Sequence, residues 1–236
     1  MNNDYIKNHK KIIDEFLRYL NGVSDDYILK GGTALMCCYH LDRFSEDIDL
    51  DSLNKRGIRN IVSEFCKVNS FSYRLAKDSP TTLRYMIHYS ENNKPLKIET
   101  SFRRKHIDAE ETFRINGIRV YNINTLCIMK SAAYQMRDKI RDLFDLSFII
   151  NNYYNDLDKS TILNVQQALA YKGLEQFDYL AETQQDELIN KDDLAESFMN
   201  ALDKLDLLVD SDVLKRHNSN FFPADLQNEE DSELEL

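Results

Sequence analysis

The sequence predicts an α+β fold in which a mixed sheet flanked by helices is followed by a helical bundle. Two periodicities support this prediction. Segments between residues 27 and 120 alternate apolar and polar residues, which is the period of a strand. Residues 159–209 repeat apolar residues at helical spacing. We therefore expect a sheet domain at 1–122, a helical domain at 123–222, and a flexible acidic tail at 223–236.

The elements follow from these two periods and from the turn residues between them. Residues 3–20 form an amphipathic helix that is predicted to end at Asn21-Gly22. A short strand at 27–30 leads into two helical turns at 34–39, and the acid/apolar alternation of 45–51 is that of a strand. The remaining predicted elements of the sheet domain are a helix at 58–68, strands at 71–75, 83–89 and 96–102, and a hairpin at 113–120 with an Asn-Gly turn.

A helix capped by Asn124 or Thr125 opens the second half of the chain. It places Lys130 among apolar residues. If this helix continued unbroken, Lys130 and Asp145 would share one face with two arginines. The polar segment 135–139 favours an interruption, so the sequence leaves both arrangements open.

Charge is distributed unevenly along the 236 residues, whose net charge is −10. Residues 51–150 contain 18 basic and 11 acidic side chains, a balance that suits a polyanionic partner. Residues 151–236 contain 6 basic and 20 acidic side chains, which suits solubility or docking to a basic surface.

The four cysteines show neither a Cys-x-x-C pair nor metal-ligand spacing with histidine. The amino terminus lacks the apolar stretch of a signal peptide, and no apolar run approaches the length of a membrane-spanning helix. The sequence therefore predicts a soluble cytoplasmic protein with reduced thiols.

The stretch from residue 30 to 51 has the strongest chemical pattern in the chain. Glycines at 31 and 32 open a predicted helix, where backbone N–H groups and the helix dipole favour a phosphate. Asp47 and Asp49 share one strand face at a separation of about 7 Å, and two such carboxylates can hold divalent ions for phosphoryl or nucleotidyl transfer. The alternative is a structural turn beside a solvated acidic strand.

These residues resemble the signature of the nucleotidyltransferase superfamily, a Gly-Gly turn followed by an Asp-x-Asp strand. Gly-Gly-Thr-Ala-Leu at 31–35 together with Arg-Phe-Ser-Glu-Asp-Ile-Asp-Leu at 43–50 is similar to the AbiEii/AbiGii toxin family. The resemblance implies a nucleotidyltransferase-like fold, an NTP substrate with Mg²⁺ or Mn²⁺, and a role in toxin–antitoxin or abortive-infection systems. Because some relatives modify the 3′ end of tRNA, the resemblance favours an RNA acceptor. The family's role in toxin–antitoxin systems also implies a cognate antitoxin.

The resemblance also implies roles for individual residues. Asp47, Asp49 and Glu99 match the metal-binding carboxylates, and Glu99 could instead accept the proton of the attacking hydroxyl. Phosphate donors would come from Gly31, Gly32, Thr33 and Ser45. Lys130 matches a lysine that stabilises the leaving pyrophosphate, and Asp142 and Asp145 match an Arg-Asp-x-x-Asp-Leu run that orients the lysine or positions the acceptor.

Each role has a structural alternative. Glu99 could pair with Lys97 on an exposed strand face, and Asp145 could belong to a surface ladder of helical salt bridges. The basic run 103–106 fits phosphate or RNA binding and an ordinary solvated loop equally well.

The predicted reaction is Mg²⁺-dependent transfer of NMP to an acceptor hydroxyl. A kinase acting on a protein or small molecule would use the same acids, and a non-catalytic nucleotide-binding module is the third possibility.

Overall fold

The computed structural model of the chain describes residues 3–55, 57–91, 93–173 and 175–208. The predicted acidic tail at 223–236 and the last part of the predicted helical domain, 209–222, lie outside these residues. No helix in the described ranges is both long enough and apolar enough to cross a lipid bilayer.

A seven-stranded mixed sheet forms the centre of the first half, in the order β3-β4-β5-β2-β1-β7-β6. Two neighbouring pairs, β2 with β5 and β1 with β7, are parallel, and the other pairs are antiparallel. The strands are β1 (Tyr27–Lys30), β2 (Asp47–Ser52), β3 (Ser72–Ser79), β4 (Thr82–His88), β5 (Leu96–Ser101), β6 (Thr112–Ile115) and β7 (Ile118–Tyr121). The mixed sheet predicted from the sequence is therefore confirmed.

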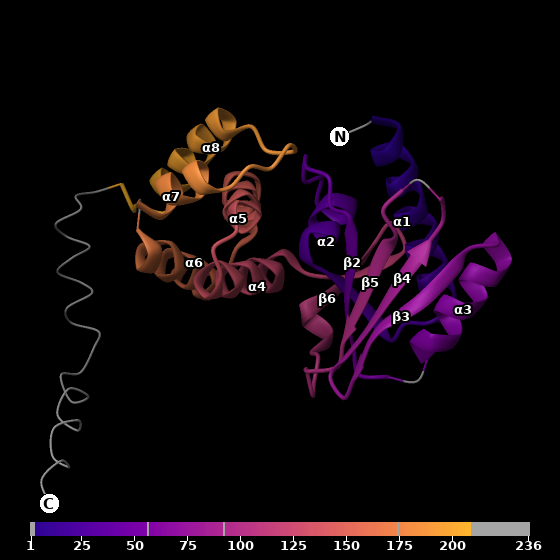
Figure 1. Ribbon diagram of the computed structural model, residues 1–236. Coiled ribbons are helices and arrows are strands. Elements are labelled where there is room, and N and C mark those ends of the chain that lie inside the picture. Colours follow the sequence, from indigo (N-terminus) through magenta and orange to yellow (C-terminus); the bar gives the residue numbers. More distant parts are fainter. Residues whose placement is uncertain (1–2, 56, 92, 174, 209–236) are drawn as a thin grey trace, which may run out of the picture.

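Three helices accompany the sheet: α1 (Asn3–Val23), α2 (Gly31–Cys38) and α3 (Gly57–Asn69). Figure 1 shows α1 and α3 on the side of the sheet that faces away from the helical half of the molecule. Ile13, Phe16, Leu17 and Leu20 of α1 are fully buried, Ile6 is partly buried, and Phe16 meets Phe65 of α3 edge to face at 5.1 Å between ring centroids. Helix α1 does not end at Asn21-Gly22 as predicted but continues to Val23, because Ser24 N–H still donates to Leu20 C=O.

The second half of the described chain is helical, as predicted. It consists of α4 (Ile123–Met136), α5 (Ile140–Tyr153), α6 (Lys159–Lys172), α7 (Glu175–Thr183) and α8 (Lys191–Lys204). Helix α4 packs on α6, and α5 packs on α8 (Figure 1). Phe198 of α8 is buried and stacks on Phe177 of α7. Two single 3₁₀ turns, η1 (Ala109–Glu111) and η2 (Tyr154–Asp156), complete the described elements.

Two local predictions differ from the structure and one is confirmed. The α4 cap is Asn122, whose side chain accepts a hydrogen bond from Thr125 N–H at 2.8 Å, and not Asn124 or Thr125. Helix α4 ends at Met136 and α5 begins at Ile140, so the continuous helix does not form. The hairpin turn is as predicted, since Asn116 and Gly117 both have positive φ, 51° and 82°.

Candidate active site

The turn between β1 and α2 brings the chain against the aspartates of β2. Gly31 has φ of 75°, and a Cβ atom at this position would lie 3.1 Å from Asp49 Oδ2. A Cβ at Gly32 would lie 2.8 Å from Arg43 Nη2 and 2.9 Å from Ser45 Oγ. The glycines are therefore required by close approach, and Asp49 faces the turn as the sequence predicts. Helix α2 has no side-chain cap at its N-terminus, so its first N–H groups are available to an anion.

Thr33 holds the turn to the strand. Its buried hydroxyl donates to the main-chain carbonyl of Asp47 and lies 2.9 Å from Ser45 Oγ. The predicted phosphate contact of Thr33 would thus need its N–H group, because the hydroxyl is already engaged by protein atoms.

Strand β2 separates its acids from its apolar residues. Ile48 and Leu50 are buried in the core, and Asp47 and Asp49 lie on the opposite face. In the sheet register, Asp49 is flanked by Lys30 of β1 and Glu99 of β5. The sheet therefore gathers three carboxylates and a lysine on one face within two strand spacings.

Asp49 lies in the least compensated position of this group. Burial raises the pKa of its carboxyl, and the negative charges of Asp47 and Glu99 raise it further, while Lys97 and Lys30 act in the opposite direction. Among the residues the structure describes, no hydrogen bond or ion pair to the Asp49 carboxylate is present.

The other two aspartates of β2 do have partners. Lys97 Nζ lies 2.5 Å from Asp47 Oδ2 on a partly exposed surface. Asp51 is buried, with Lys30 Nζ at 2.5 Å and the Tyr121 hydroxyl at 3.0 Å. Lys30 therefore relieves the repulsion expected from a third acid on this strand.

Glu99 is held by a cation of the neighbouring strand. Arg84 of β4 approaches Glu99 Oε2 with Nε at 2.7 Å and Nη2 at 2.6 Å. The expected alternative pair with Lys97 does not form, because Lys97 is bound to Asp47. A metal-ligating role of Glu99 stays a prediction that requires Arg84 to give way.

A divalent cation requires several oxygen ligands that converge on one point. Within the described ranges, no group of three or more Asp, Glu, His or Cys side chains converges at ligand distance. The unpaired carboxylate of Asp49 next to the exposed Asp47 nevertheless offers the oxygen ligands that Mg²⁺ takes when it keeps several waters and binds a substrate phosphate. The residues fit a cation held by two carboxylates.

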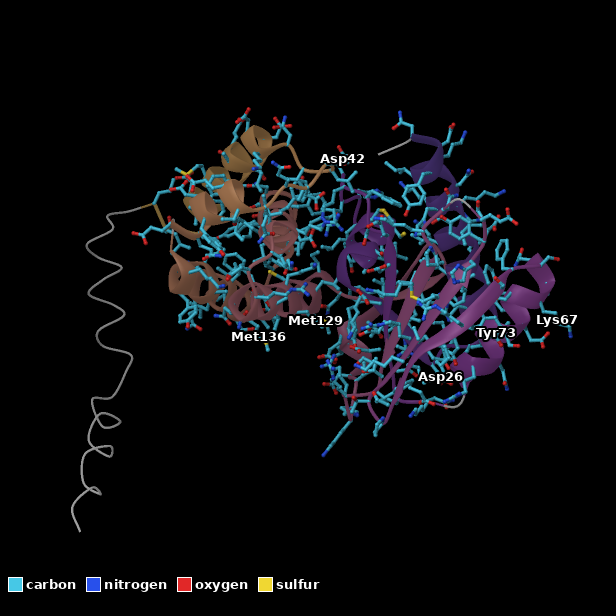
Figure 2. The ribbon with its side chains drawn as sticks, in the orientation of Figure 1. Asp26, Asp42, Lys67, Tyr73, Met129 and Met136 are labelled. Atoms are coloured by element: carbon cyan, nitrogen blue, oxygen red, sulfur yellow. The ribbon has the colours of Figure 1, made fainter. Side chains whose placement is uncertain are left out.

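A cavity of about 740 Å³ lies between the sheet and the helical half. The loop before β2, which carries Asp42, also lies where the two halves of the molecule meet (Figure 2). The cavity lining includes polar or charged residues from both halves: Gly32, Arg43, Ser45, Glu46, Asp47, Asp49 and Lys97 from the first, and Lys130, Arg137, Lys139, Arg141, Asp142 and residues 183–186 from the second. The predicted residues Gly31, Thr33, Glu99 and Asp145 are not part of this lining.

A buried ion network joins the two halves below the cavity. Asp145 of α5 is fully buried, with Arg43 Nε and Nη2 each at 2.7 Å and Lys130 Nζ at 2.5 Å. Burial alone would raise the pKa of Asp145, but Lys130 and Arg43 outweigh it and hold the pKa below the usual range. Lys130 is thus oriented by Asp145, as one of the predicted roles requires.

Asp142 connects Arg137, which lies between α4 and α5, to the same ion network. Arg137 donates to its two carboxylate oxygens at 2.7 and 3.0 Å, and Lys130 Nζ lies 3.4 Å away. The surface ladder considered as an alternative is absent for these aspartates, because both are buried. Arg141 pairs instead with Asp186 of the α7–α8 connection.

Sequence reasoning missed Arg43, Lys97 and Arg137. Arg43 is the first residue of the motif at 43–50, but its partner Asp145 is 102 residues away. No local sequence pattern therefore indicates this ion pair. The basic run 103–106 follows the far end of β5, away from Lys97, and its residues are not part of the cavity lining. The structure therefore gives this run no contact with the predicted nucleotide site.

Solved structures of other proteins share the fold of this chain. JHP933 from Helicobacter pylori has a similar structure, with a TM-score of 0.73 and 26% identity over 91% of this chain and 95% of that chain. The nucleotidyltransferase toxin MenT4, Rv2826c of Mycobacterium tuberculosis H37Rv, shares the fold at a TM-score of 0.51 and 16% identity over 87% of this chain and 85% of that chain. No curated protein sequence matches the chain.

The family model "Nucleotidyl transferase AbiEii toxin, Type IV TA system" matches residues 15–216, which include both the sheet and the described helical bundle. The chain is therefore a nucleotidyltransferase that belongs to the AbiEii toxin family of type IV toxin–antitoxin systems.

Proposed function

We propose that the protein transfers NMP from an NTP to a hydroxyl group of RNA, with tRNA as the expected acceptor, and that this reaction is its toxic activity. The observation that supports the proposal best is the position of Asp47 and Asp49. Asp49 faces the Gly31-Gly32 turn, and both aspartates line a cavity whose other wall carries Lys130.

Carboxylates of the site would bind the metal ion, and N–H and hydroxyl groups would bind the phosphates of the NTP. Asp47 and Asp49, with Glu99 if Arg84 releases it, would hold Mg²⁺ or Mn²⁺, which supplies charge neutralisation on the phosphates. The first N–H groups of α2 and the Ser45 hydroxyl would donate to the outer phosphates. These are assignments of role, and they follow from the donor types and their placement around one cavity.

In the transfer itself, the acceptor oxygen attacks the α-phosphorus in line. The bond from this phosphorus to the bridging oxygen breaks, and pyrophosphate leaves with the electron pair. Lys130, which lines the cavity and is held between Asp142 and Asp145, would offset the charge that develops on the leaving group. The proton of the attacking hydroxyl passes to solvent or to a carboxylate, and Glu99 would accept it in place of binding the metal if Arg84 releases it.

Two arguments favour RNA as the acceptor and the cytoplasm as the site of action. The basic balance of residues 51–150 suits a polyanion. All four cysteines are free thiols, as expected in a reducing compartment where NTPs and RNA are abundant. Family membership supports the further proposal that a cognate antitoxin counteracts the protein.

The experiment incubates the protein with each α-³²P-labelled NTP, Mg²⁺ and total RNA, and follows the label by gel electrophoresis. Wild type is expected to label RNA, and Asp47→Ala is expected to reduce labelling at least 100-fold. The exposed variant Asp138→Ala is the control and should label RNA as wild type does. Equal labelling by Asp47→Ala and wild type would refute the assigned role. Transfer from γ-labelled but not α-labelled NTP would identify a kinase.

A further inference from the structure

The face of the sheet that carries the catalytic carboxylates continues outward over β5, β4 and β3. The register places Lys77, Arg84, Glu99 and Asp49 side by side on consecutive strands. A second row contains Arg74, Met86, Lys97 and Asp47. Going from β2 to the edge of the sheet, each row therefore leads from acids to basic residues.

A β-bulge is responsible for the end of the first row. Leu75 pairs with Tyr85 and Lys77 pairs with Arg84, so one extra residue, Ala76, is inserted in β3. Without the bulge, Lys77 would point to the opposite face from Arg74, because side chains alternate along a strand. The bulge turns Lys77 onto the face that carries Arg74, and it also makes the edge strand a poor template for pairing with another strand.

Two of the four cations on this face are uncompensated. Arg84 and Lys97 are paired with Glu99 and Asp47. Arg74 and Lys77 are exposed, and in the part of the chain that the structure describes neither has an acidic partner. Free positive charge is therefore concentrated at the edge of the sheet, about three strand spacings or 14 Å from Asp47.

The two faces of β3 differ in a way that supports a binding role. On the side of α3, Asp78 pairs with Arg59 and Lys55, and Tyr73 packs against Tyr85. Figure 2 shows Tyr73 and Lys67 together at this α3 side of the molecule. Helices α1 and α3 lie on that side of the sheet (Figure 1). Arg74 and Lys77 lie on the opposite face from Tyr73 and Asp78, because side chains alternate along the strand and the bulge falls between Leu75 and Lys77.

We propose that the face formed by Arg74, Lys77, Met86 and His88 binds the phosphate backbone of the RNA acceptor and leads its terminal hydroxyl to Asp47 and Asp49. The inference rests on the proposed function. Neither Arg74 nor Lys77 lines the cavity that would hold the NTP. We therefore assign their positive charge to binding of a second, longer anion, the RNA acceptor. A single strand suits this open face, because its phosphates can follow the cationic edge while exposed bases contact Met86 and His88.

The test compares Arg74→Gln/Lys77→Gln with the control Arg18→Gln/Lys67→Gln. The control removes one arginine and one lysine from the exposed surfaces of α1 and α3, on the covered side of the sheet. Binding of a fluorescent single-stranded RNA with a tRNA 3′ end is measured by anisotropy at several salt concentrations. If both side chains neutralise phosphates, the slope of log K against log salt becomes shallower by about 1.4 in the face variant and stays unchanged in the control.

Label transfer from α-³²P-NTP completes the experiment. The face variant is expected to raise KM for RNA at least 10-fold, with KM for the NTP unchanged. Equal RNA affinity and equal salt slopes in both variants would overturn the inference while leaving the proposed function intact. The same holds if the loss follows Arg103→Gln/Lys105→Gln instead. If wild type transfers label to no RNA, the proposed function fails, and this result is distinct from a failure of the face variant.

Discussion

Replacing Asp145 by Asn removes one negative charge from the centre of the network that joins the sheet to the helical half. The Asp145 carboxylate has no exposed surface and contacts Arg43 at 2.7 Å and Lys130 at 2.5 Å. The substitution preserves shape, so the main change is that Arg43 stays buried without its anion and Lys130 keeps Asp142, at 3.4 Å.

The magnitude follows from this burial. Removing one partner of a buried ion pair costs about 3–5 kcal/mol, because an uncompensated charge remains in a medium of low polarity. The total free energy of unfolding of a protein is about 5–15 kcal/mol. For a chain of this length, each kcal/mol lowers Tm by about 2–4 °C, so Asp145→Asn is expected to lower Tm by about 6–20 °C.

Urea unfolding followed by circular dichroism measures the loss of free energy of unfolding, and thermal unfolding measures the change in Tm. Asp138→Asn serves as the matched control, because Asp138 also pairs with a lysine at 2.5 Å but has 47% of its side chain exposed. The control should lose less than about 1 kcal/mol. A triple variant, Arg43→Met/Asp145→Leu/Lys130→Met, should recover most of the stability, because it removes Asp145 together with both of its cations and leaves Asp142 paired with Arg137.

A loss below about 1 kcal/mol in Asp145→Asn would refute this reasoning, since it would mean that Arg43 and Lys130 are not desolvated around Asp145. Failure of the triple variant to recover stability would show that the network contributes through its shape and hydrogen bonds more than through its charge.

Three further predictions concern the glycine turn, the lysine and a buried histidine. Gly31→Ala and Gly117→Ala strain the backbone alike, since φ is 75° and 82°, but only the former places a Cβ 3.1 Å from Asp49; transfer activity should fall only in Gly31→Ala, and equal activity would contradict the close approach. Lys130→Met should lower kcat by about 10²–10³ with the fold retained in circular dichroism, whereas an unchanged kcat would exclude its role at the leaving group. Burial lowers the pKa of His9 below its ordinary value, so the unfolded chain binds the proton more readily. Stability should be full above about pH 6.5 and decrease below it by up to about 1.4 kcal/mol per pH unit, and urea unfolding at pH 7 and 5 should show that His9→Gln removes this dependence.

The alternation of acids and apolar residues in β2 was enough to predict the strand and the shared face of Asp47 and Asp49. The residues on its other face, Ile48 and Leu50, are buried as the period requires. The hairpin turn at Asn116-Gly117 was equally predictable, because few residue pairs adopt positive φ at both positions. Periodicity works here because each side chain's environment is set by its immediate neighbours.

Helix ends were predicted less well, because a single hydrogen bond can move the end of a helix by one or two residues. Helix α1 passes through Gly22, and the cap of α4 is Asn122, one residue before the helix begins. Local preference is weak at such positions, so the terminal residue depends on individual hydrogen bonds in the folded chain.

By itself, the sequence determined the α+β class, the shared face of Asp47 and Asp49, the glycine turn, and the position of Lys130 among apolar residues of a helix. Each of these depends on spacing between residues that are close in the chain. Only the tertiary structure decided which charges meet. Asp145 is bound by Arg43 from the other half of the chain, Glu99 is held by Arg84, and a one-residue bulge turns Lys77 onto the face that carries Asp47 and Asp49. These contacts depend on strand order, register and burial, which are properties of the folded chain as a whole and leave no pattern in any single segment.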